Sequence, residues 1–447
     1  MHARPWRRIA GVALACLTVP AWGYDLVNAY RDALANDADF LAARSALQAA
    51  RENVPQARAG LLPQVSASTQ RTRNQTDQLQ TSPLVRQQAW THSSYPAESG
   101  ALSLRQPLYR KLNWAQLSFA EAQVAAAEAG FEKDRQDAGL RVAQAYFEVL
   151  FAQTRVRVLQ AQLEAFTGQL KLAERALDAG QGTRTDIDDA RARALQAKAG
   201  LVDANYALDN SRRTLAALVG KMPPGLADVA PARLPLAPAE PAVLEHWLQQ
   251  MEAANPELAS LRRQVEMAQQ EIEKQRAGHH PTLDLIAARQ YGANDNINSI
   301  NTRYFTNYLG VQASLPIFSG GGVSAAVRQA EANLDKARFQ LEARRQRLSV
   351  DTQKYFSGVA LGVDKVRASE AALEAAVQAL ISTRKSVQAG TRTTVDVLNA
   401  LQRVAEATQS LAQARYEFLL NRLRLAAVTG QLDDDLVAQI NGALGHP

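Results

Sequence analysis

Hydrophobic residues recur every seven positions along two long stretches of this chain, 117–220 and 327–430. The second stretch repeats the first at a constant offset of 210 residues without a gap, so that Leu117 corresponds to Val327 and Gly220 to Gly430. A seven-residue apolar period is typical of helices that pack as coiled coils. In both copies the phase also jumps by four residues, which locally unwinds a supercoil. The pattern predicts two internal structural repeats, each with two packing regimes along one helix.

Each copy is expected to form a helical hairpin. Segments 109–179 and 319–389 contain no proline, and at a rise of 1.5 Å per residue each would form roughly 100 Å of helix. Gly180 follows the first of these segments and Gly390 the second, and glycine tolerates the left-handed backbone that ends helices. Return helices about half as long follow, at 186–219 and 396–429. Taken alone, these hairpins would also fit a soluble antiparallel coiled coil.

Segments that alternate between apolar and polar residues precede each long helix. In the second copy Leu309, Val311, Ala313 and Leu315 alternate with polar or small residues, and 64–69 alternates in the same way in the first copy. Strands of about ten residues with this period are typical of membrane β-barrels, although soluble β-hairpins would look the same. Two polar segments, 76–97 and 292–303, are predicted to be loops between the strands.

The number of predicted strands restricts the architecture. Apart from the N-terminus, the chain has no run of 18 apolar residues that would predict a spanning helix. Four strands are too few to close a barrel, for which eight is the minimum, and open sheet edges are not tolerated in lipid. A membrane-embedded form would therefore need several copies that share one barrel in a cyclic arrangement.

The N-terminus reads as a secretory signal peptide, residues 1–23. Arg4, Arg7 and Arg8 precede an apolar stretch, and Ala21-Trp22-Gly23 offers a small-residue cleavage site. As an alternative, Ala13-Leu14-Ala15-Cys16 resembles a poor lipidation site, with Cys16 as the modified residue. Cys16 is the only cysteine, so cleavage after Gly23 would leave an exported chain without disulfides, stabilised by burial or assembly alone.

Composition argues against several other classes of function. The chain of 447 residues carries a net charge of +6 with 6% aromatic residues, which predicts no nucleic-acid partner. We find no phosphate-binding loop, no metal-ligand spacing and no catalytic constellation. His279 and His280 are adjacent and lack an accompanying acid cluster, and Gly320-Gly321-Gly322 lacks the lysine of a phosphate loop. The sequence thus predicts no enzyme and no cofactor.

Three short motifs carry a resemblance to a known family. They are Gly-Thr-Arg-Thr-Thr-Val-Asp-Val-Leu-Asn-Ala at 390–400, Thr-Asp-Ile-Asp-Asp-Ala-Arg-Ala at 185–192, and Leu-Leu-Pro-Gln at 61–64. Together with the duplication, which fixes their spacing, they make the chain resemble the TolC family of outer-membrane factors over essentially the whole mature sequence.

The resemblance implies an α+β membrane protein that forms a homotrimer. Each chain would give four strands to a trimeric 12-stranded β-barrel, continued by a long α-helical coiled-coil barrel through the periplasm. The expected units are a signal peptide (1–23), equatorial helices (24–61), a barrel hairpin (62–107), a long helical hairpin (108–219), a proline-rich linker (220–242), second equatorial helices (243–280), a second barrel hairpin (281–316), a second helical hairpin (317–429) and a C-terminal equatorial segment (430–447).

The implied function is a passive export duct across the periplasm and outer membrane. Such a duct serves a tripartite efflux pump or a type I secretion system, and its partners are a periplasmic adaptor (membrane fusion) protein, an inner-membrane pump and outer-membrane lipid. The expected location is the cell outer membrane, with most of the helical mass in the periplasm. The alternative is a soluble periplasmic coiled-coil adaptor or scaffold.

The resemblance also implies site residues at the hairpin tips. Asp396 would form a ring of acids at a periplasmic gate, and Asn399 stands where the family representative carries a second acidic ring, which predicts weaker cation block. Arg392 would lock the tip by pairing with Asp186 and Thr185 of the neighbouring hairpin. Threonine and aspartate at a helix start are equally suited to capping free N–H groups.

Overall fold

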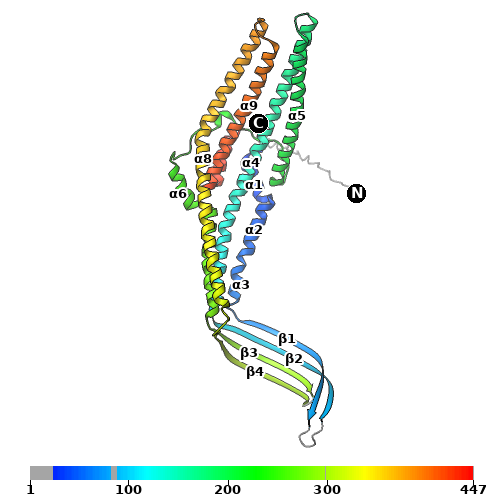
Figure 1. The fold of residues 1–447 in the computed structure, drawn as a ribbon, viewed down its shortest axis with the longest axis vertical. Coiled ribbons are helices and arrows are strands. Elements are labelled where there is room, and N and C mark those ends of the chain that lie inside the picture. The colour runs from blue at the N-terminus through cyan, green and yellow to red at the C-terminus, as the bar shows by residue number, and fades with distance from the viewer. Residues whose placement is uncertain (1–23, 82–87, 297–298, 446–447) are drawn as a thin grey trace, which may run out of the picture.

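The computed structural model describes residues 24–81, 88–296 and 299–445. The predicted signal peptide, including Cys16, lies outside these residues. The molecule is elongated, with two helical hairpins reaching one end, a curved sheet at the other, and both ends of the described chain near the middle (Figure 1).

The two copies of the repeat contain elements in the same order, except that three short α-helices precede the strands in the first copy and two in the second. The first copy comprises α1 (Leu26–Asn36), α2 (Ala38–Arg51), α3 (Asn53–Ala59), β1 (Gln64–Thr81), β2 (Gln88–Arg110), α4 (Lys111–Asp178) and α5 (Arg184–Val219). The second comprises α6 (Leu244–Ala254), α7 (Pro256–Arg276), β3 (Thr282–Asn296), β4 (Ser299–Ser314), α8 (Gly322–Gln388) and α9 (Thr394–Val428), followed by α10 (Asp434–Gly442). Short 3₁₀ turns lie at Pro231–Arg233 and Ala277–His279.

The predicted pair of long helical hairpins is confirmed. Helices α4 and α8 have 68 and 67 residues, and their return helices α5 and α9 have 36 and 35. The positions at the predicted phase jump are buried, with Leu348 at 4% and Thr352 at 0% exposure in α8. Thr352 donates its hydroxyl hydrogen to the carbonyl of Leu348, which satisfies a polar side chain inside the core.

The four predicted strands are present, and they form one antiparallel sheet in the order β1-β2-β3-β4. Their register places Val65, Leu104, Ala287 and Leu309 in one row across the sheet. Val65 and Leu309 are 66% and 74% exposed, so this face presents apolar side chains outward. Within the described chain, β1 and β4 each have one edge without a strand partner.

The predicted loops at 76–97 and 292–303 were wrong for the residues that the structure describes, which are strand, whereas 82–87 and 297–298 lie outside the described residues. The predicted strand length of about ten residues was also wrong. The strands have 18, 23, 15 and 16 residues, and β1 and β2 pair continuously from Gln64 opposite Arg105 to Thr81 opposite Gln88. Backbone groups form the ladder regardless of side-chain polarity, and this polar segment contains good strand formers, such as Thr76 and Tyr95. Alternation of hydrophobicity therefore underestimated the strands.

A buried ionic cluster holds the base of the sheet beside the helices. Asp284 on β3 is 2% exposed. Its carboxylate accepts from Arg105 (Nε 3.0 Å, Nη2 2.6 Å) and from Arg110 (Nε 2.7 Å, Nη2 2.6 Å), both on β2. Two guanidinium groups satisfy one buried carboxylate, an arrangement in which loss of a single partner is strongly destabilising.

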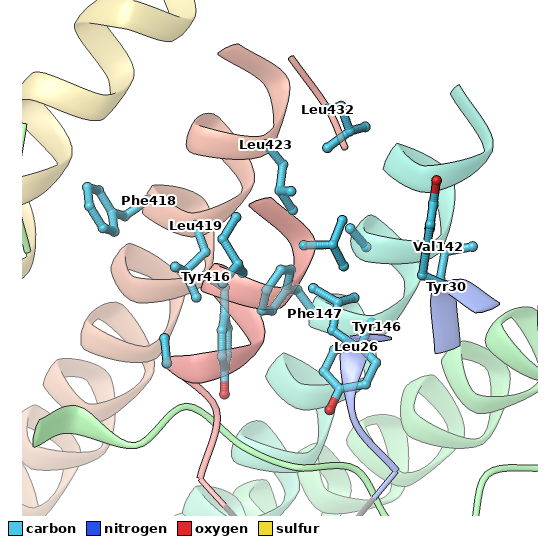
Figure 2. Close-up of a cluster of buried hydrophobic side chains, with 14 of the residues drawn as sticks. Leu26, Tyr30, Val142, Tyr146, Phe147, Tyr416, Phe418, Leu419, Leu423 and Leu432 are labelled. Carbon is cyan, nitrogen blue, oxygen red and sulfur yellow. The ribbon is translucent and has the colours of Figure 1, made fainter. Parts of the chain in front are cut away.

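The main core lies where the short helices surround the long ones. Tyr146, Phe147 and Tyr416 pack at its centre, with Phe147 and Tyr416 ring centroids 5.9 Å apart (Figure 2). The Tyr146 hydroxyl lies 3.0 Å from the carbonyl oxygen of Tyr24 and 2.8 Å from that of Ala227. Burial is the largest cause that raises the Tyr146 pKa, so the phenol remains a donor that fixes the linker and the N-terminal segment to α4.

The linker between the copies is tied down along its length. Leu226 forms a parallel bridge with Tyr24, and Val229 forms an antiparallel bridge with Leu444. Asp228 accepts from the Arg157 guanidinium at 2.7 Å and from the Tyr416 hydroxyl at 2.8 Å. The proline-rich segment therefore joins α4 to α9 at the level of the core.

Within the described residues, no helix combines the length and apolar composition that crossing a bilayer requires.

Gly430 and Gly180 allow a matched test of packing at the helix ends. Both have φ of +73°, but a Cβ on Gly430 would lie 2.2 Å from the carbonyl oxygen of Ala254, whereas a Cβ on Gly180 would meet nothing within 4 Å. We expect Gly180→Ala to cost about 1–2 kcal/mol of unfolding free energy from left-handed strain alone. Gly430→Ala should cost a further 1–3 kcal/mol or so from the clash.

Thermal unfolding of the detergent-purified variants measures the difference. Equal melting temperatures for the two variants would show that α9 does not pack against Ala254 in this way.

Candidate functional site at the hairpin tips

The two hairpin tips lie at the same end of the molecule, opposite the sheet (Figure 1). Each long helix ends in the same turn. Gly180 donates to the carbonyl of Leu177 at 2.9 Å and Gln181 to that of Ala176 at 2.8 Å, whereas Gly390 and Thr391 donate to Val387 and Ser386, both at 3.0 Å. The duplication therefore produces two equivalent tips, and any chemistry that differs between them lies in their side chains.

Asp396 forms a capping box at the start of α9. Its carboxylate accepts from the Thr393 backbone N–H at 3.0 Å and from the Thr393 hydroxyl at 2.9 Å. The bond from the backbone N–H is the largest cause that lowers the Asp396 pKa, and the bond from the hydroxyl is the next. The positive charges of Arg392 and Arg403 lower this pKa further. The side chain is ionised at neutral pH and its carboxylate stays partly exposed. Capping and a charged tip are thus compatible roles.

Asp186 forms the equivalent capping box at the start of α5. The Thr183 hydroxyl donates to its carboxylate at 2.6 Å, and the Thr183 backbone N–H does so at 3.2 Å. Thr185, the predicted lock residue, is exposed. In the first tip the capping threonine is therefore Thr183, two residues before Thr185.

Arg392 and Asp186 form no ion pair within the described part of the single chain, and Arg392 is exposed. The predicted lock joins neighbouring hairpins. If these hairpins belong to two different protein chains, the contact is not present in the structure of one chain. The lock of Arg392 with Asp186 and Thr185 therefore stays a prediction.

Arg193 is a tip residue that sequence reasoning missed. From α5, its Nη2 donates to Asn399 Oδ1 at 2.8 Å and its Nη1 to Gln402 Oε1 at 3.0 Å, both on α9. The contact joins residues 206 positions apart along the chain, so local patterns could not reveal it. The one available signal was that the repeat places a second arginine, Arg403, at the corresponding position.

A small apolar contact lies beside this arginine. Leu398 of α9 is 0% exposed and is clustered with Phe166 of α4 and with Ala190, Ala194 and Ala197 of α5. Three alanines on one helix face let the two hairpins approach closely. The first and second hairpins therefore meet near the tips through Leu398, with Leu401 packed against the same cluster, and through the Arg193 fork.

An apolar groove runs between α4 and α9 farther from the tips. Its volume is about 440 Å³, and it is lined mainly by Val158, Ala161, Ala165, Leu401, Val404 and Ala405. Among the described residues, no cluster of three or more histidine, cysteine or acidic side chains could hold a metal ion.

Comparisons with known proteins agree with this geometry. The sequence profile of the family described as "Outer membrane efflux protein" matches residues 29–221 and 247–431. The alkaline protease secretion protein AprF of Pseudomonas aeruginosa is 34% identical over 95% of this chain and 88% of its own length. The proteases secretion protein PrtF of Dickeya chrysanthemi is 32% identical over 93% and 90%. The outer membrane protein TolC of Vibrio cholerae is 30% identical over 97% and 96%.

Solved structures share the fold. The outer-membrane channel OprN has a TM-score of 0.74 at 20% identity and covers 91% of this chain and 90% of its own. VceC of Vibrio cholerae has the same TM-score at 21% identity and covers 91% and 97%.

A four-stranded sheet whose ends continue into two very long helical hairpins defines the class of outer-membrane channels for efflux or secretion. The chain belongs to the outer membrane efflux protein family, whose members include TolC. This confirms the resemblance drawn from the tip motifs and decides against a soluble scaffold.

Proposed function

We propose that three copies of this chain form a passive duct that exports proteins in a type I secretion system. The observation that carries the proposal is the sheet with two free edges, β1 and β4, in the described chain. Three sheets of four strands, joined edge to edge, would close a barrel of twelve strands, and closure is what a lipid environment requires.

The side chains of the sheet support this arrangement. One face carries Val65, Leu102, Leu309 and Val311, each at least 53% exposed, as expected for an outer surface in contact with lipid. The register places Ser66 and Ser103 opposite each other on the other face, which suits a water-filled interior. Six hairpins from three chains would continue the barrel as a tunnel of twelve helices through the periplasm.

The unit boundaries follow from this arrangement. Residues 1–23 would be removed as a signal peptide, and 62–107 with 281–316 would form the barrel, extended to Arg110 by the observed end of β2. Residues 108–219 and 317–429 would form the tunnel. The segments 24–61, 220–280 and 430–447 would surround its middle as an equatorial belt.

Two of the relatives point to the cargo. AprF is named for alkaline protease secretion and PrtF for secretion of proteases, and both align with nearly the whole chain. We therefore assign a protein cargo, a periplasmic adaptor and an inner-membrane pump as partners. The apolar groove of about 440 Å³ between α4 and α9 would receive apolar side chains of the adaptor. The chain itself would have no enzymatic role.

The tips would form the periplasmic gate. Around a threefold axis, three ionised Asp396 carboxylates would lie close to one another with Asn399 one turn further along α9. Arg392 would pair with Asp186 and Thr185 of the neighbouring hairpin and hold the tips closed.

The assembly and the cargo can be tested together. Native mass spectrometry of the detergent-purified protein should give a trimer, because unpaired strand edges in lipid are costly. In cells that lack their own duct, co-expression with the adaptor and pump of a protease secretion system should restore protease in the medium.

A soluble protein in the periplasmic extract, or a stable monomer in lipid, would contradict the duct. A trimer that restores resistance to small drugs but never protease export would leave the duct in place and overturn the cargo.

The gate assignment predicts the effect of Asp396→Asn. Planar-bilayer recordings should show lower cation selectivity and weaker block by divalent cations, because a ring of negative charge attracts cations. The fold should persist because the side-chain amide oxygen of asparagine can still accept the hydrogen bond from the Thr393 backbone N–H that Asp396 accepts. A variant with unchanged selectivity and a lower melting temperature would show that Asp396 only stabilises the start of α9.

A further inference from the structure

The Arg193 fork brings a positive charge to the residue proposed to line the gate. Both of its acceptors, the side-chain amides of Asn399 and Gln402, are neutral. Among the described residues, no carboxylate lies within 4 Å of its guanidinium, whereas Arg191, two positions earlier, lies 3.7 Å from Glu174. The charge of Arg193 is therefore oriented by hydrogen bonds and is not compensated by an ion pair.

The acids of α9 on either side of the fork are both engaged, and Glu406 accepts a hydrogen bond from Gln402 Nε2 at 3.0 Å. The carboxylate of Asp396 accepts hydrogen bonds from the backbone N–H and the hydroxyl of Thr393. Asp396 lies three residues before Asn399, which is about one turn of helix. The tip therefore carries two layers of opposite charge, a carboxylate from α9 and, next to it, a guanidinium supplied by α5.

We propose that Arg193 lowers the cation selectivity that Asp396 gives this entrance and that it also holds the two hairpins of one chain together. The inference rests on the proposed gate, because it takes Asn399 to face the opening. Three copies would place three guanidinium groups beside three asparagines, directly inside the ring of Asp396. The positive ring offsets part of the attraction of the acidic ring for cations, so the entrance is less cation-selective than the acidic ring alone would make it.

The two roles of Arg193 depend on different properties of the side chain. Selectivity depends on its charge, which lysine keeps. The link between the two hairpins depends on the planar guanidinium group, which donates to two amide oxygens at once. A lysine ammonium cannot reproduce this geometry. Arg193→Gln removes the charge, whereas Arg193→Lys keeps the charge and removes the two-pronged link, so the two variants test the two roles separately.

The experiment uses the purified full-length protein in planar bilayers with a gradient of potassium chloride, and it measures reversal potential and conductance. Arg193→Gln should shift the reversal potential toward that of a more cation-selective channel. Arg193→Lys should keep the wild-type reversal potential and raise the conductance, because the hairpins are less tightly joined. Asn399→Asp, which puts a carboxylate beside the guanidinium, should shift selectivity in the same direction as Arg193→Gln.

Arg191→Gln is the matched control, since that arginine lies on the same helix and already faces Glu174. It should leave the reversal potential close to wild type. A shift in Arg191→Gln as large as that in Arg193→Gln, or no shift in Arg193→Gln and Asn399→Asp, would overturn the assignment. A wild-type protein that forms no conducting pore would instead refute the proposed duct, so the two failures are distinguishable.

Discussion

Unpaired backbone groups at the two edges of the sheet are the constraint on which the rest of this structure depends. β1 and β4 each leave a row of N–H and C=O groups without a strand partner in the described chain, and lipid offers no replacement for those hydrogen bonds. The exposed apolar face of the same sheet, which includes Val65 and Leu309, favours lipid on its outer side. Both demands are met when the edges of separate copies pair.

The helical part has to hold its geometry over a great length with few large side chains. Near the tips the hairpins contact each other through a small cluster around Leu398, with Leu401 packed against it, and through the Arg193 fork. At the equator the aromatic core around Tyr146 and Tyr416 joins α4, α9 and the linker. The chain is therefore firmly packed at its middle and lightly joined at its tips, which is the distribution that a gated end requires.

Much of the fold could be predicted from the sequence because the seven-residue apolar period occurs in both copies of the repeat. The heptads gave both hairpins, and Gly180 and Gly390 marked their ends to within two residues. The strand lengths could not be predicted, since Thr76 and Tyr95 lie in a polar segment whose pairing is carried by the backbone. The buried ion pairs of Asp284 could not be predicted either. In the sequence it is one polar residue of an alternating strand, whereas in the structure its carboxylate binds both Arg105 and Arg110.

Some of the tip residues could be predicted from the sequence, and others could be recognised only in the structure. Asp396 and Asp186 were predicted from the resemblance of the two tip motifs to the TolC family, and the structure shows that both form capping boxes at helix starts. Arg193 meets Asn399 only because two hairpins distant in sequence fold side by side. Contacts of this kind require the tertiary structure, and contacts between copies, such as the predicted lock of Arg392, require the assembly.

Disulfide cross-linking between β1 and β4 tests the central claim that copies close one barrel by pairing these edges. Ser66→Cys on β1 would be combined in turn with Gly310→Cys, Gln312→Cys and Tyr308→Cys on β4, in a chain whose own cysteine, Cys16, lies in the predicted signal peptide. Disulfides form only when the Cα atoms come within about 7 Å. The account predicts that at least one combination gives a covalent trimer on a denaturing gel in membranes under oxidising conditions. Exclusively monomeric protein in every combination would contradict it.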